Sequence, residues 1–258
     1  MSGFQSGPRK RPAFDVRCVA KAIIHGTLNN DPESRATLLI YDFSFFSYRS
    51  TRIKEADIFF EFVDGKNSSQ GSAPTVKRIA PYSRHSMMET TQTNTKKLTA
   101  DAGIDAGSVV TANTKVGVES STEKITTHAA EIVGSQPFDN WGNYTEAQWH
   151  LKENDSQQNG IVAMLRSCIL LTRDNDEEFE CVPYIRVSPN FSTWLGSLAS
   201  TRSRDDAIPF DPSFEPFSDL DGKVEIDRWN LNAVDLEQVW DCTFSTTFGN
   251  AVKSQANS

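Results

Sequence analysis

The sequence predicts an α+β protein with a twisted, mostly antiparallel sheet and flanking helices. Several segments alternate apolar and polar residues, which is the period of a strand with one buried face. Two other segments, one near each end, space their apolar residues as an amphipathic helix does. The chain has 258 residues, of which 38% are hydrophobic and 23% are charged. This composition suits a soluble globular protein of one large or two small domains.

The first residues of the chain predict a tail and then a helix. Residues 1–12 are polar and basic, lack the apolar run of a secretory signal, and are expected to form a flexible tail. Between Phe14 and Leu28 the apolar residues follow near-helical spacing, and Gly26 suits a helix C-cap. The apolar positions of this expected helix are Phe14, Val16, Val19, Ala20, Ile23 and Ile24.

Strands follow the helix. Residues 36–46 and 56–63 are rich in aromatic residues at alternate positions, and a further short strand is expected at 76–80. A basic link with Arg49, Arg52 and Lys54 joins the first two strands. Residues 81–97 are polar and favour no assignment.

An unusually long alternating segment runs from Ala102 to Glu119. None of its even-numbered residues is charged, whereas Asp105, Lys115 and Glu119 lie at odd positions. Strands of globular proteins average about 5–6 residues, and a strand that crosses a membrane needs about 9–11. Two interpretations therefore stay open: a long, half-exposed strand of a soluble sheet, or a strand that enters a bilayer.

The second half of the chain predicts further strands and two helices. Strands are expected at 122–132 and 144–151, and a hairpin with an acidic tip at 161–187. Short helices are expected within 188–204 and 229–240, separated by an irregular, acidic, Pro-rich segment. We therefore divide the chain into a domain of residues 1–204 and a segment of residues 205–258 that packs on it.

The charge distribution favours a membrane over nucleic acid. The net charge is −8, but residues 1–54 hold nine Lys or Arg and four Asp or Glu, a balance of +5, so the remainder carries −8 − 5 = −13. An acidic body is a poor partner for nucleic acid. A basic N-terminal part is attracted to anionic lipid.

No catalytic motif is present, and we expect no enzyme activity. The chain has no Gly-rich phosphate loop, no G-x-S-x-G and no His-Glu-x-x-His. We expect no metal site and no cofactor, because the four histidines are far apart in the sequence. The four cysteines lack Cys-x-x-Cys spacing and are expected to be reduced.

The predicted order of elements resembles the pore-forming N-terminal domain of the gasdermin family. Residues 14–28 are similar to the family's first helix, 36–62 to its next strands, and 99–119 and 160–187 to its two membrane hairpins. The chain is too short for the inhibitory domain of animal gasdermins, and it is more similar to the compact fungal gasdermin-like regulators of cell death.

The resemblance implies a function. Such a protein is cytoplasmic when soluble, binds acidic phospholipids of the plasma membrane, and oligomerises with itself or with a variant of the same protein. Its hairpins then form a β-barrel that lyses the cell, here in fungal non-self recognition. The candidate lipid-binding residues are Arg9, Lys10, Arg11, Arg17, Lys21, Arg49, Arg52 and Lys54. The candidate membrane-strand residues are Ile104, Ala106, Val110, Ala112, Val116, Val118, Ile161, Ala163, Leu165, Ile169, Leu171, Ile185 and Val187.

A second function stays open. The same strands would build a soluble β-rich module that binds lipid or carbohydrate and forms no pore.

Overall fold

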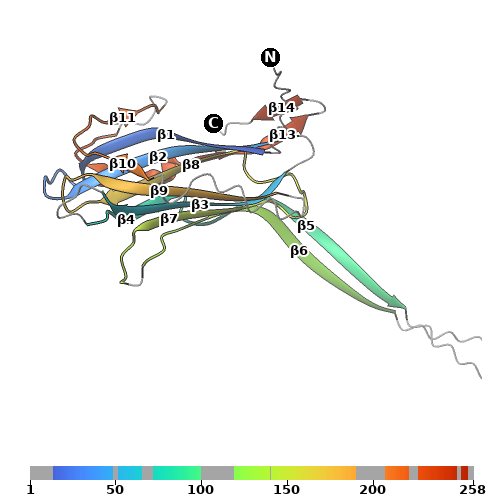
Figure 1. Ribbon diagram of the computed structural model, residues 1–258. Helices are drawn as coiled ribbons and strands as arrows, with labels where there is room; N and C mark the ends of the chain where they lie inside the picture. Colours follow the sequence, from blue (N-terminus) through green and yellow to red (C-terminus); the bar gives the residue numbers. More distant parts are fainter. Residues whose placement is uncertain are drawn as a thin grey trace, which may run out of the picture.

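The computed structural model describes residues 14–48, 52–65, 72–99, 119–139, 141–189, 207–220, 226–248 and 251–254. These residues form two antiparallel sheets that pack face to face, with a long hairpin that leaves one of them (Figure 1). The described part of the chain contains almost only strands, so the predicted α+β fold with flanking helices, and with it a gasdermin-like architecture, is wrong.

The first sheet has the strand order β11-β1-β2-β8-β12, and β4 also pairs with β8. Its strands are β1 (Phe14–Thr27), β2 (Arg35–Ser47), β4 (Thr75–Ala80), β8 (Met164–Thr172), β11 (Phe217–Ser218) and β12 (Asp241–Thr243).

The second sheet has the order β10-β9-β3-β7-β6-β5. Its strands are β3 (Ile53–Asp64), β5 (Ser83–Thr99), β6 (Glu119–Ser135), β7 (Glu146–Lys152), β9 (Phe179–Pro189) and β10 (Ile208–Phe210). A separate ribbon pairs β13 (Ser245–Phe248) with β14 (Ala251–Ser254).

The main core lies between the two sheets. Aromatic side chains from both sheets meet there: the ring centroids of Tyr41 and Phe60 are 5.1 Å apart, and those of Phe60 and Trp149 are 6.2 Å apart in an edge-to-face arrangement. The fully buried Trp149 also donates a hydrogen bond from Nε1 to the carbonyl of Pro81 at 2.9 Å. This bond ties β7 to the turn that leads into β5.

A second core covers the outer face of the first sheet. Leu38, Ile40 and Leu170 point to this face and pack with Leu231 and Leu236 from the C-terminal segment. The central strands of this sheet are therefore buried on both faces. This explains why β2 and β8 contain continuous apolar runs rather than simple alternation.

The helix expected at 14–28 is instead the strand β1. Its apolar residues have near-helical spacing because a β-bulge interrupts their alternation. β1 pairs with β2 from Phe14↔Ser47 to Thr27↔Arg35, with a register shift between Ala20 and Ala22. Before the bulge, Val16 and Ala20 face the main core. After it, Ile23 does so, while Ala22 and Ile24 face the second core. The bulge thus changes which positions point inward.

Gly26 has a steric role rather than a capping one. A Cβ atom at this position would lie 1.8 Å from the carbonyl oxygen of Arg228. Glycine therefore allows the segment around Arg228 to lie directly against the end of β1. Hydrogen bonds from the amides of Thr27 and Asn30 to the carbonyls of Arg228 and Trp229 hold it there.

The other predicted helices differ as well. In place of a helix over 229–240 the chain forms a 3-10 turn, η2 (Leu231–Ala233), and a four-residue helix, α1 (Leu236–Val239). Val234 adopts an extended conformation between them, which prevents a continuous helix. A helix was expected within 188–204. The first two of these residues belong to the end of the strand β9, and the others lie outside the described residues.

The expected hairpin at 161–187 is not formed. β8 pairs with β2, β4 and β12 in the first sheet, whereas β9 pairs with β3 and β10 in the second. The acidic turn therefore crosses between sheets. The strands expected at 36–46, 56–63, 76–80, 122–132, 144–151, 161–172 and 179–187 are confirmed with small changes of bounds, and the unassigned 81–97 lie mostly in β5.

Candidate membrane hairpin

The strands β5 and β6 form a long antiparallel ribbon (Figure 1). It extends away from the two packed sheets, which are called the body below. They pair from Ser83↔Gly134 to Thr99↔Glu119. β6 also pairs with β7, but only from Glu131 to Ser135. Within the described residues, the rest of β6 has β5 as its only partner strand. A two-stranded ribbon is marginally stable alone in water, and its outer edges are free to pair with further strands.

The sequence of the ribbon beyond the sheet is polar at both even and odd positions. Ten of the 22 residues in 90–99 and 119–130 are Ser or Thr, namely Thr90, Thr91, Thr93, Thr95, Thr99, Ser120, Ser121, Thr122, Thr126 and Thr127. Charges occupy neighbouring positions, as at Lys96 and Lys97 or Glu123 and Lys124. Charged residues in this stretch thus occupy both even and odd positions of the sequence, whereas the even positions of 102–118 are uncharged.

The backbone is irregular at the base of the ribbon. The register shifts between Met87 and Thr90, and Met88 has a positive φ of 54°. A non-glycine residue in this region of φ is uncommon and costs free energy. The neighbouring contacts therefore have to hold it.

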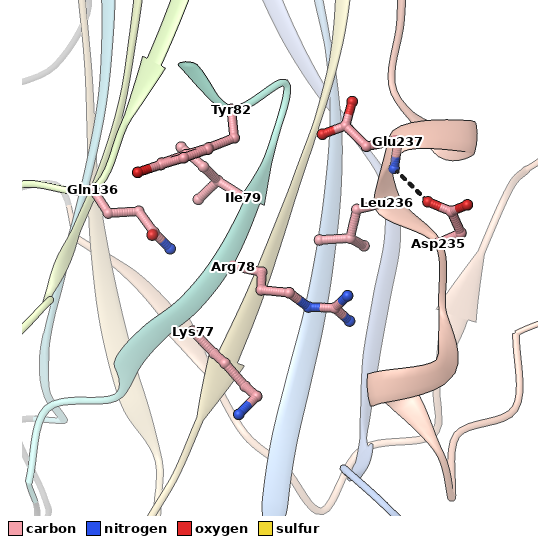
Figure 2. A pocket seen from close by; sticks show the side chains of 8 residues that line it. All are labelled: Lys77, Arg78, Ile79, Tyr82, Gln136, Asp235, Leu236 and Glu237. Carbon is pink, nitrogen blue, oxygen red and sulfur yellow. Dashed lines mark hydrogen bonds between the residues drawn. The ribbon is translucent and has the colours of Figure 1, made fainter.

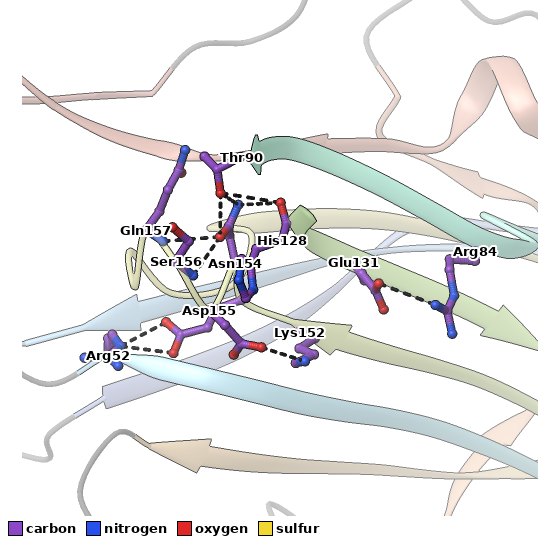
Figure 3. Close-up of polar contacts among 11 residues, drawn as sticks. Arg52, Arg84, Thr90, His128, Glu131, Lys152, Asn154, Asp155, Ser156 and Gln157 are labelled. Atoms are coloured by element: carbon purple, nitrogen blue, oxygen red, sulfur yellow. Dashed lines mark hydrogen bonds and ion pairs between the residues drawn. The ribbon is translucent and has the colours of Figure 1, made fainter. Parts of the chain in front are cut away.

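Asn154 makes those contacts, and Figure 3 shows its side chain among Thr90, His128, Ser156 and Gln157. Its side chain is completely buried. Nδ2 donates to the carbonyls of Met88 at 2.6 Å and His128 at 3.2 Å, one on each strand of the ribbon. Oδ1 accepts from the amides of Ser156 and Gln157. One side chain thus ties both strands to the loop between β7 and β8.

An ion pair fixes the same loop to β3. The carboxylate of Glu153, whose side chain is 3% exposed, accepts from Nε of Arg52 at 2.9 and 3.1 Å and from the amide of Gly160 at 3.1 Å. Its own amide donates to the carbonyl of Lys54 at 2.8 Å. The neighbouring Lys152 donates to Asp155 at 2.9 Å, which raises the pKa of Lys152. The ribbon therefore starts from a rigid, hydrogen-bonded base.

A cavity of about 290 Å³ lies beside the base of the ribbon, between β4 and α1 (Figure 2). Tyr82 precedes β5 and Gln136 follows β6 at its rim. Its lining contains two basic residues, Lys77 and Arg78, and two acidic residues, Asp235 and Glu237, so its formal charges balance. Arg78 also donates to the carbonyls of Asn232 and Val234. The cavity thus lies where the C-terminal segment is hydrogen-bonded to β4.

The predicted membrane-strand residues fall into two groups. The first group lies outside the described residues: Ile104, Ala106, Val110, Ala112, Val116 and Val118. The second group lies in or beside the body core, where only Ala163 is half-exposed: Ile161, Ala163, Leu165, Ile169, Leu171, Ile185 and Val187. A membrane role for the second group would require the two sheets to separate.

The predicted lipid-binding cations do not form one patch within the described residues, which exclude Arg9, Lys10, Arg11 and Arg49. Arg17 and Lys21 are on β1 of the first sheet and pair with Asp15 and Asp219. The hydrogen bond from Lys21 to Asp219 raises the pKa of Lys21. Arg52 and Lys54 lie at the start of β3 in the second sheet, where Arg52 pairs with Glu153 and Lys54 is exposed.

The described residues contain no group of three or more His, Cys, Asp or Glu side chains arranged to hold a metal ion. None of their helices is long and apolar enough to span a membrane.

Sequence reasoning missed the base of the ribbon. The Thr-rich composition of 90–99 was a signal for a strand, but its polarity hid the signal. Asn154 lay in an expected turn, and no local pattern distinguishes a buried asparagine from an exposed one.

No family model matches this chain, and no curated protein matches it. Among solved structures, one described as "Pore forming protein" is similar over 68% of this chain and 78% of its own, with 9% identity and a TM-score of 0.35. The Clostridium perfringens NetB toxin in its membrane-inserted form is similar over 67% of this chain and 85% of its own, with 8% identity and a TM-score of 0.30.

Proposed function

We propose that this chain is a pore-forming protein that inserts the β5–β6 hairpin, including its connecting residues 100–118, into a bilayer. The observation that carries the proposal is the ribbon itself. It leaves the sheet beyond the last pair with β7 and leads toward the segment whose even positions are uncharged.

The arrangement of polarity along the hairpin supports this role. The Ser- and Thr-rich part, charged at both even and odd positions, suits a barrel wall in water. The alternating part beyond it suits a strand with lipid on one side and a wet lumen on the other. Only a closed barrel satisfies the backbone groups of strands inside a bilayer. Because one hairpin supplies two strands, the pore requires several copies of the chain.

We propose that the chain forms pores preferentially in membranes that contain acidic lipid. The preference for acidic lipid rests on the basic balance of residues 1–54. A role in fungal cell death rested on an α+β fold that the structure does not have.

Dye release from liposomes tests the proposal with a matched pair of variants. The purified full chain is expected to release dye, and more from vesicles with acidic lipid than from neutral ones. Val110→Asp places a charge at an even position and should abolish release, because a charge on the lipid face destabilises a membrane strand and this cost recurs in every copy of the chain; the cost is about 2–4 kcal/mol for Arg or Lys at mid-membrane and smaller for Asp. Val109→Asp makes the same change at the adjacent odd position and should retain release.

Equal release by the two variants would contradict the assigned membrane strand. Saturable binding to vesicles with no release would favour the soluble lipid-binding module instead.

A further inference from the structure

A second cavity, of about 180 Å³, is lined by residues from the end of β1, the β1–β2 connection, the start of β2, the turn after β8 and the C-terminal segment. The connection between β1 and β2 lies at the end of the body away from the β5–β6 hairpin (Figure 1). The strand β4 runs from this end of the body toward the hairpin. Its first residue, Thr75, pairs with Thr172 beside this cavity, and its last residue, Ala80, precedes the turn into β5.

Three arginines line this cavity against a single carboxylate. Arg35 donates from Nε to Asp176 at 2.8 Å, and Arg173 donates from Nη1 to the same carboxylate at 3.1 Å. Arg228 lies 3.8 Å from the exposed Glu215, and Arg35 also lies 3.7 Å from the exposed Glu33, but neither glutamate lines the cavity. Among the lining residues, arginine charges therefore exceed carboxylate charges by two, on a chain whose net charge is −8.

The guanidinium groups are held in place. The Arg173 side chain is 4% exposed, and its Nε has no hydrogen-bond partner within the described residues. The Arg228 guanidinium lies over the ring of Trp229, with Cζ 4.8 Å from the ring centroid. Gly26 lets the backbone of Arg228 approach β1, as described above. The side chains are therefore oriented before any ligand arrives, which lowers the entropic cost of binding.

His25 lines another part of the cavity and adds no charge to it at pH 7. Burial, with a further contribution from Arg173, lowers the pKa of His25 to about 4. Its ring is therefore neutral at pH 7 and is hydrogen-bonded through Nδ1 to Thr37 at 2.9 Å. The site thus combines fixed arginine charges with a neutral hydrogen-bonding side chain.

We propose that this cavity binds a phosphate or sulfate group through Arg35, Arg173 and Arg228. Arginine forks match the oxygens of such groups. Asp176 occupies two of the three arginines in the unliganded protein and is the internal competitor. The proposal is independent of pore formation, since the cavity and the hairpin lie at opposite ends of the body.

Calorimetric titration of the full chain with inorganic phosphate, and separately with sulfate, tests the site. One saturable site is expected. Arg228→Gln should weaken phosphate binding about tenfold or more, because a charge-assisted hydrogen bond is lost. Arg186→Gln is the matched control, since Arg186 is exposed on β9 with its guanidinium over Tyr184, and it should bind as the original does.

Asp176→Asn gives the opposite expectation. Without the competing carboxylate, phosphate should bind several-fold more tightly and should raise the melting temperature more than it does in the original chain. A purely structural role for Asp176 predicts lower stability with no gain in affinity.

The source of the group is read from vesicles of phosphatidylcholine with and without phosphatidylinositol 4-phosphate. Binding that requires the phosphoinositide and is lost in Arg228→Gln assigns a lipid headgroup. Phosphate binding without vesicle binding assigns a soluble phosphate or sulfate ester. Absence of saturable binding, or equal affinities in the original chain, Arg228→Gln and Asp176→Asn, would overturn the proposal.

Discussion

The side-chain amide of Asn154 donates a 2.6 Å hydrogen bond to the main-chain carbonyl of Met88, whose φ is positive. The bond spans 66 residues of sequence and joins the loop after β7 to the first strand of the hairpin. The unusual backbone at Met88 is thus stabilised by a buried polar group from a distant part of the chain.

Asn154→Ala should destabilise the protein by about 2–4 kcal/mol, since it leaves several buried backbone groups without partners. Urea denaturation measures the change in the free energy of unfolding. Asn159→Ala is the control, because Asn159 is exposed and bonds only to Gln157 among the described side chains. An equal effect of the two substitutions would show that Asn154 does not hold the base of the ribbon.

Substitutions of Arg52 and Lys54 should distinguish a cation with a structural role from one that is available to bind lipid. Arg52→Gln leaves the buried carboxylate of Glu153 without its cation and should cost about 2–3 kcal/mol of stability. Lys54→Gln, on the exposed side of the same strand, should change stability by less than about 0.5 kcal/mol. Thermal and urea unfolding measure both, and a near-neutral Arg52→Gln would contradict the structural role.

The stability of the protein should fall as the pH is lowered from about 6.5 to 4. The pKa of His25 is about 4 in the folded protein and about 6.5 in an unfolded chain. Between these values the unfolded state binds the extra proton, so folding is opposed more strongly at lower pH. The contribution is complete above pH 6.5, is lost toward pH 4, and amounts to roughly 3 kcal/mol, because each pKa unit corresponds to about 1.4 kcal/mol.

His25→Gln, which keeps a polar group near Thr37, should flatten this part of the pH profile even if it lowers stability at pH 7. Urea unfolding at several pH values compares the slopes. Parallel profiles for the two proteins would assign the pH dependence to other groups.

Cys18 should be the cysteine that reacts in the folded protein. It is exposed on β1, whereas Cys168, Cys181 and Cys242 are buried. Burial raises the pKa of Cys168 to about 12 and that of Cys242 to about 11, so both thiols stay protonated and unreactive. A thiol reagent at pH 8 should label one cysteine in buffer and four in urea. Loss of the native labelling in Cys18→Ser is the check, and rapid labelling of a second site would contradict the burial.

Local patterns located most strands but not their partners. The alternate aromatic positions in 36–46 and 56–63 were sufficient, because they stay in one phase along each segment even though the other face of β2 is also buried. At 14–27 the bulge between Ala20 and Ala22 broke the phase and produced false helical spacing. At 161–187 both strands were found, but no residue of the turn indicates that β8 and β9 belong to different sheets.

The candidate hairpin was predicted only in part. Its alternating residues 102–118 stood out, whereas the polar strand β5 and the base at Asn154 did not. The cavity with three arginines gathers residues from positions 25 to 229, and such a gathering exists only after folding.

The pairing of β11 with β1 and of β12 with β8 has a consequence for synthesis on the ribosome. Sheet edges near the start and middle of the chain are completed by Phe217–Ser218 and Asp241–Thr243, which emerge late. The β5–β6 ribbon pairs residues 83–99 with 119–134, which emerge earlier, and Asn154 of its base follows them. We therefore expect a nascent chain to display its ribbon beside an unfinished body, a situation in which apolar strands aggregate. The many serines and threonines in 90–99 and 119–130 should reduce this risk.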